Sequence, residues 1–97
     1  MNVSQKINHL NDNSYDDDIT VTDVPQGQFL AITANSIANG ATTREISISL
    51  MSLEQAPGGT RTTNTNLFVR QGGETAIQVK VYAVDGTELA SNTQDYS

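Results

Sequence analysis

The sequence predicts an all-β fold, a small antiparallel β-sandwich of six to seven short strands. After residue 18, apolar residues repeatedly alternate with polar ones, which is the period of a half-buried strand. Gly, Pro and Asn turn signals separate these runs, and no stretch of a dozen residues carries a convincing helical pattern. The 97 residues are enough for one domain, which we place at residues 19–97.

Residues 1–18 are predicted to be a flexible acidic tail. Asn, Asp and Ser predominate there, and the few apolar side chains cannot bury enough surface to offset the entropy of ordering the segment. Val3, Ile7 and Leu10 fall at helical spacing, but a helix this short is marginal on its own.

The first strands are expected at residues 19–24 and 29–34, with a turn at residues 25–27 between them. The second run is apolar at both parities, which is typical of a central strand. Asn39-Gly40 marks the next turn.

A third strand follows, and its alternation predicts that Ile46, Ile48 and Leu50 face the core. Met51 and Leu53 continue the apolar series out of phase, which indicates a β-bulge.

The second half of the chain begins with a strong breaker at residues 57–59. The Thr-rich segment that follows, residues 60–69, is typical of an edge strand. After a turn at residues 71–73, Ile77, Val79 and Val81 are expected to face the core. Asp85-Gly86 predicts a hairpin with a two-residue turn, after which the polar residues 91–97 are expected to fray.

A chain of this size with this number of strands favours the immunoglobulin-like sandwich, although the Cys pair and Trp typical of that fold are absent. The net charge of -6 argues against nucleic acid or an anionic membrane as partner. No apolar run could span a bilayer, and residues 1–10 lack the pattern of a signal peptide. The protein is therefore expected to be cytosolic or a mature form whose signal peptide has been removed.

No catalytic residue, cofactor or metal site is expected, and the protein is predicted not to be an enzyme. There is no Cys, and the single histidine, His9, lies in the predicted tail, so a nucleophile would lack a base. The run at residues 16–18 lacks calcium-loop spacing, and adjacent acids on an extended chain point to opposite sides.

The few cations supply the candidate binding site. We expect a weakly basic, polar surface for a flexible protein partner, formed by Arg44, Arg61, Arg70, Lys80 and Tyr82. The alternative is that the cations are solubility charges that pair with acids, namely Glu45, Glu54, Glu74 and Glu88. An aromatic platform for a sugar or peptide has only three tyrosines available, Tyr15, Tyr82 and Tyr96, of which Tyr82 is outward by parity.

Three segments resemble the small periplasmic curli-assembly proteins of the CsgC/CsgH type. They are residues 29–53, including Arg44-Glu45-Ile46-Ser47-Ile48-Ser49-Leu50, the Gly58-to-Thr65 connection, and Gln78-to-Gly86. The resemblance implies an immunoglobulin-like sandwich in the periplasm or another extracytoplasmic compartment. It also implies a protein that binds curli-type amyloid subunits and inhibits their premature assembly, and we expect the chain to be a monomer. The Cys-x-Cys of some members is absent near residues 41–43, so no redox role is implied.

Two other classes of function stay open: the sugar- or peptide-binding module that the tyrosines would serve, and a structural module. A structural or adhesion module, such as a pilin-like or phage decoration sandwich, would self-associate by adding its N-terminal arm to a neighbour as a strand.

Overall fold

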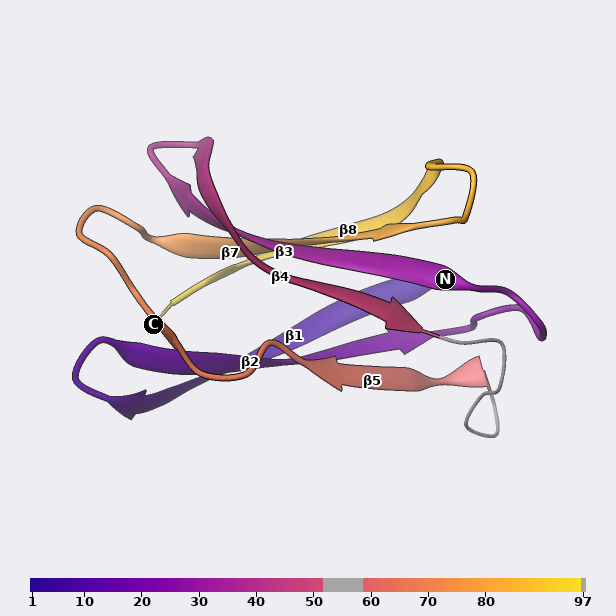
Figure 1. Cartoon of the computed structure of the whole chain (residues 1–97), viewed down its shortest axis with the longest axis horizontal. Coiled ribbons are helices and arrows are strands. Elements are labelled where there is room, and N and C mark those ends of the chain that lie inside the picture. Colours follow the sequence, from indigo (N-terminus) through magenta and orange to yellow (C-terminus); the bar gives the residue numbers. More distant parts are fainter. Residues whose placement is uncertain (52–58, 97) are drawn as a thin grey trace.

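The computed structural model describes residues 1–51 and 59–96, which form two antiparallel sheets packed face to face (Figure 1). In the first sheet, β2 (Ser14–Thr22) is central, with β1 (Asn2–Asn11) on one side and β5 (Arg61–Asn64) and β6 (Phe68–Val69) on the other. The second sheet has the order β4-β3-β7-β8, formed by β4 (Ala41–Met51), β3 (Leu30–Ala38), β7 (Ala76–Tyr82) and β8 (Glu88–Asp95). The predicted all-β class is confirmed.

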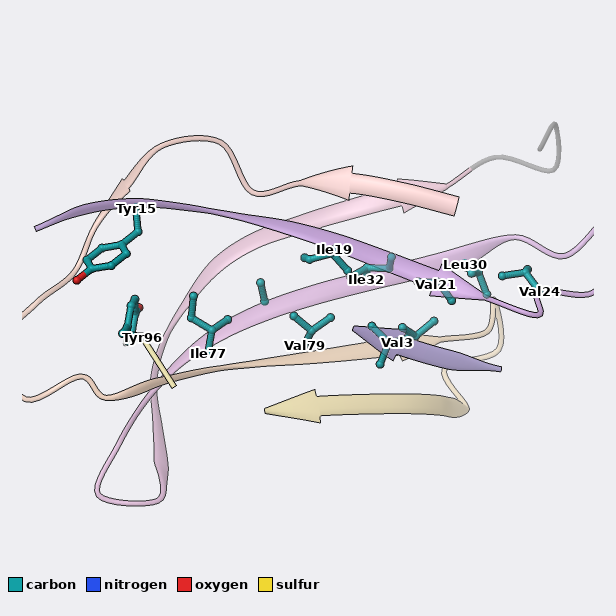
Figure 2. Close-up of a cluster of buried hydrophobic side chains, with 12 residues drawn as sticks. Val3, Tyr15, Ile19, Val21, Val24, Leu30, Ile32, Ile77, Val79 and Tyr96 are labelled. Atoms are coloured by element: carbon teal, nitrogen blue, oxygen red, sulfur yellow. The ribbon is translucent and has the colours of Figure 1, made fainter. Parts of the chain in front are cut away.

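The core lies between the sheets and is built mainly from β-branched side chains (Figure 2). Along each central strand every second residue points inward, as Ile77, Val79 and Val81 do with 0% exposure. Tyr15 and Tyr96 close one end of this core, and Val24 and Leu30 lie at the other end (Figure 2).

The flexible N-terminal tail predicted for residues 1–18 is wrong, because these residues form β1 and the first half of β2. The hairpin turns at Asp12, whose φ is 39°, and Val3 faces Val21 across the strand pair with 8% exposure. Val3 and Ile7 are four residues apart, a spacing that fits a strand as well as a helix. Four residues are two full periods of a strand and about one turn of a helix, so both residues lie on one face in either structure. The described residues form eight strands, because the hairpin adds β1 and the segment predicted as one strand at residues 60–69 forms both β5 and β6.

The N-terminal hairpin also removes the free arm that a strand-adding structural module would need. Residues 2–11 are already paired with β2, from Asn2 opposite Thr22 to Asn11 opposite Ser14.

The prediction that Ile46, Ile48 and Leu50 face the core is wrong for Ile48 and Leu50, and a bulge is the reason. Ile46 packs against the core as expected. Ala34 pairs with Ser47 and Asn35 with Glu45, so Ile46 is the extra residue. The bulge therefore lies before Ser47, and the residues after it take the opposite faces from those expected. The inward row is Ser47, Ser49 and Met51, and the outward row is Ile48 and Leu50. Leu53, predicted to continue the series, lies outside the described residues.

Several turn and strand predictions are confirmed. Asn39 and Gly40, both with positive φ, join β3 to β4, and β3 is an interior strand of its sheet. The Thr-rich segment forms β5 and β6, which pair with β2 and with no other strand in the part of the chain that the structure describes. Of the predicted breaker, residues 57 and 58 lie outside the described residues.

The last hairpin differs from the prediction in its turn. Ala83 N donates to the Thr87 carbonyl and Gly86 N to the Ala83 carbonyl, which leaves a three-residue loop ending at Gly86 with φ 90°. This is a type I turn followed by a glycine bulge rather than a two-residue turn. The chain does not fray after it, because β8 runs to Asp95 and Tyr96 is 5% exposed.

No helix of the described residues is suited to crossing a membrane.

Candidate functional site

The outer surface of sheet β4-β3-β7-β8 carries an exposed apolar patch, which we call the β4 face. Its members are Phe29, Ile48, Leu50 and Val84, with exposed fractions of 45%, 59%, 83% and 80%. Single exposed apolar residues are normal on soluble proteins, but a contiguous group is typical of an interaction surface. The bulge at Ile46 produces this patch, because it turns Ile48 and Leu50 away from the core.

A shallow apolar groove of about 360 Å³ forms part of the β4 face. It lies where β3 begins and β4 ends, beside the β7–β8 turn, and is lined by Phe29, Leu30, Ala31, Leu50, Met51, Ala83 and Val84. None of these lining residues carries a charge. The groove therefore suits an apolar side chain rather than a polar ligand.

β4 is also an edge strand. On one side it pairs with β3 along its length, from Ala38 opposite Ala41 to Leu30 opposite Met51, and on the other side it has no strand partner among the described residues. A free edge presents unpaired backbone N–H and C=O groups to an incoming strand. The β4 face and this edge together form the candidate binding site.

Two of the five predicted site residues, Lys80 and Tyr82, lie on the same outer surface of the sheet as the β4 face. Ala31 lies opposite both Leu50 and Tyr82, and Thr33 lies opposite both Ile48 and Lys80. Lys80 and Tyr82 thus stand two strands away from the apolar pair. Lys80 lies 3.5 Å from the Glu88 carboxylate, the pairing that the solubility-charge alternative predicted.

Arg44 is bound in a polar cluster around the buried Glu74 carboxylate and is not a free surface charge. Its Nη2 and Nε each lie 3.0 Å from the carboxylate of Glu74, which is 2% exposed. Thr43 Oγ1 and the Gln71 backbone N–H donate to the same carboxylate, at 2.6 and 2.8 Å. Burial would raise the pKa of Glu74, but these hydrogen bonds outweigh it and lower the pKa to about 2.

Arg61 lies inside the sandwich and not on the surface. It is opposite Val21 on β2, is 2% exposed, and none of its guanidinium nitrogens has a hydrogen-bond partner among the described residues. Desolvation lowers its pKa. Arg61 therefore cannot join Lys80 and Tyr82 on one face.

Arg70 lies in the β6–β7 connection, against the aromatic end of the core. Its Cζ is 4.6 Å from the ring centroid of Tyr96 and 6.0 Å from that of Tyr15. Both tyrosines are 5% exposed, so neither can serve as an open platform for a ligand. His9, expected in a solvated tail, stacks on Tyr15 at 4.6 Å between ring centroids.

Asp17, predicted to lie in a flexible acidic tail, is a buried acid instead. Its side chain is 0% exposed, and neither carboxylate oxygen has a hydrogen-bond partner among the described residues. Burial, together with the charges of Asp18 and Asp16, raises its pKa to about 7. The signal was present in the sequence, since Tyr15, Asp17, Ile19 and Val21 share one parity.

Comparison with known proteins yields no match. No family model, no curated protein and no solved structure matches this chain. The resemblance to the curli-assembly proteins therefore stays a prediction.

Proposed function

We propose that this chain is a non-enzymatic, extracytoplasmic protein with an immunoglobulin-like sandwich that binds amyloid-forming, curli-type subunits and delays their assembly. The observation that carries the proposal is the free edge of β4 with Ile48 and Leu50 exposed beside it. The bound segment would pair with β4 as an added strand.

The edge defines the chemistry of the partner. Backbone groups of an edge strand are satisfied by another extended chain, so the bound segment is a strand and not a helix. Ile48 and Leu50 are two residues apart on one face, and an added strand meets them with every second side chain. The favoured segment therefore carries apolar residues at alternating positions, one of which enters the groove beside Leu50.

Amyloid-forming subunits meet these requirements. Their fibres grow by stacking extended segments edge to edge, and each incoming segment needs an open strand edge. A monomeric sandwich that pairs through β4 with the last segment of a fibre covers the strand edge on which the next subunit would add. One bound sandwich per fibre end is enough for this, so inhibition is expected well below equimolar ratios.

The test is a thioflavin T time course of a purified curli-type subunit with increasing amounts of this protein. A lag phase that lengthens at a molar ratio of about one to ten supports the proposal. An unchanged time course at equimolar protein rejects it.

Self-association is the competing use of the same edge, and it would place the chain among structural modules. Sedimentation of the protein alone separates the two. A monomer at all concentrations fits the proposal, whereas an oligomer that dissociates when Leu50 is replaced by Glu fits a structural role.

A further inference from the structure

A second surface with binding chemistry lies around Arg70, away from the β4 face. Arg70 packs against Tyr15 and Tyr96, which close the end of the core opposite to Leu30 of the apolar groove (Figure 2). The two surfaces are thus separate.

The guanidinium of Arg70 is fixed before any ligand arrives. Nε donates to the Glu74 carbonyl at 2.7 Å, and the group lies over the Tyr96 ring. Tyr96 is itself held by a 2.8 Å hydrogen bond between its hydroxyl and Ser36 Oγ. A ligand would therefore order few side-chain torsions on binding Arg70.

Hydrogen-bond donors of Arg70 remain available. Nη1 makes a 3.4 Å contact to the Tyr15 hydroxyl, and Nη2 has no acceptor among the described residues. Nη2 is not among the buried atoms that lack a partner, so solvent reaches it. Nη2 can thus present two N–H groups to a ligand.

The carboxylate of Glu74 does not form an ion pair with Arg70. The ion pairs within residues 1–51 and 59–96 are Arg44 with Glu74 and Lys80 with Glu88. The Glu74 carboxylate already accepts hydrogen bonds from Arg44, Thr43 and Gln71 N. Within the described residues Arg70 therefore has no ion-pair partner, in a chain whose net charge is -6.

A polar hollow of about 240 Å³ lies beside this charge. Its walls are Asn13, Arg70, Gln71, Gly72 and Gly73. Gly73 has φ 85° in the turn that Glu74 N closes on the Gln71 carbonyl. The amides of Gly72 and Gly73 make no hydrogen bond within the described residues, so they can supplement the guanidinium.

We infer that Arg70, Asn13 and the Gln71–Gly73 turn bind a single carboxylate group of a partner molecule. The planar guanidinium matches the two oxygens of a carboxylate. A phosphate dianion fits less well, because the hollow has one cation and the chain around it is acidic. The carboxylate can come from a chain terminus or from an Asp or Glu side chain.

The experiment is a titration followed by amide chemical shifts, with four small probes. N-acetyl-Ala-Ala with a free carboxylate represents a chain end, and N-acetyl-Asp amide represents a side chain. N-acetyl-Ala-Ala amide lacks the charge, and inorganic phosphate tests the dianion. We expect saturable shifts of Asn13, Gln71, Gly72, Gly73 and the Arg70 Nε–H with either or both carboxylates, and none with the amide.

Variants locate the effect. Arg70→Gln is expected to abolish the shifts. Arg70→Lys keeps the charge but loses the paired N–H donors of the guanidinium, and it is expected to weaken binding about tenfold. Lys80→Gln removes a cation of the outer sheet surface and should leave binding unchanged. If Arg70→Gln does not fold, the comparison of the free and amidated peptides on the unmodified protein decides alone.

Three results would overturn the inference. They are equal shifts from the amidated peptide, carboxylate-induced shifts that persist in folded Arg70→Gln, and phosphate binding tighter than either carboxylate. None of these results bears on fibre inhibition by the β4 face, so the two proposals can fail separately.

Discussion

Glu74 and Arg44 form a bidentate ion pair that links the β6–β7 connection to β4. Arg44 Nη2 to Glu74 Oε1 and Arg44 Nε to Glu74 Oε2 are both 3.0 Å. The carboxylate is 2% exposed, and Thr43 and Gln71 N supply further donors. A buried charge of this kind is tolerated because its hydrogen-bonding capacity is filled.

Removing one partner of this pair should destabilise the folded protein. We expect Arg44→Met to lower the free energy of unfolding by about 2 to 4 kcal/mol, since it leaves the Glu74 carboxylate buried without its cation. Urea unfolding of Arg44→Met, Glu74→Leu and the double variant measures the effect. The double variant should be less destabilised than the sum of the single variants, and simple additivity would show that the two side chains are not coupled.

The same carboxylate predicts a loss of stability in acid. Its pKa is lowered in the folded state, from 4.5 to about 2, so the stability it contributes is full above pH 4.5 and is lost as the pH falls towards 2. Thermal unfolding between pH 5 and pH 2 checks this. Glu74→Gln should be less stable at pH 5 but should lose less on acidification. A decline as steep as that of the unmodified protein would assign the acid sensitivity to other groups.

Asp17 predicts the opposite dependence at higher pH. Its pKa is raised in the folded state, from 3.8 to about 7, so the folded protein holds the proton more tightly than the unfolded chain. Stability from this group is full below about pH 3.8 and falls as the pH rises to 7, by roughly 4 kcal/mol. Denaturant unfolding at intervals from pH 4 to pH 8 measures the slope.

The variant that isolates this effect is Asp17→Asn, which keeps the shape of the side chain and cannot ionise. It should flatten the decline between pH 4 and pH 7 and be more stable than the unmodified protein at pH 8. Asp95→Asn, which changes an exposed acid at the end of β8, is the control and should keep the slope. A decline that survives Asp17→Asn would contradict the assignment.

The N-terminal hairpin predicts that residue 3 matters for folding. Val3 is 8% exposed and faces Val21 across the sheet, so Val3→Asp buries a charge and should cost about 3 kcal/mol or more. The neighbouring Ser4 is exposed, and Ser4→Asp should change stability by no more than about 0.5 kcal/mol. Melting temperatures of the two variants make the comparison. Equal values would restore the flexible-tail interpretation.

Much of the fold could be predicted because alternation and turns are local signals. The strand of Ile77, Val79 and Val81 shows its period without interruption, and Asn39-Gly40 adopts the positive φ values that its residue types favour. The β1–β2 hairpin was missed because its inward row mixes apolar with polar residues, including Gln5 and Asp17. Gln5 is accommodated by hydrogen bonds to Ile77 and Asn92 of the other sheet, which no local pattern reveals.

The candidate site was only partly predictable. The outward direction of Lys80 and Tyr82 follows from parity along β7. The exposure of Ile48 and Leu50 depends on where one extra residue is inserted, and the apolar run alone is compatible with a bulge on either side of it. Arg61 was expected at the surface because charged residues are rarely buried, and burial of a strand residue is decided by the opposing sheet.

The most informative measurement is the thioflavin T time course of a curli-type subunit in the presence of two matched variants. Leu50→Glu places a charge on the β4 face, and Leu67→Glu makes the same change at an exposed leucine between β5 and β6, where the exposed fraction is 64%. Circular dichroism of both variants first establishes that they fold. We expect the unmodified protein and Leu67→Glu to lengthen the lag phase equally at a molar ratio of about one to ten, and Leu50→Glu to lose the effect. Equal inhibition by both variants, or no inhibition by the unmodified protein, would contradict a role for the β4 face in holding back fibre assembly.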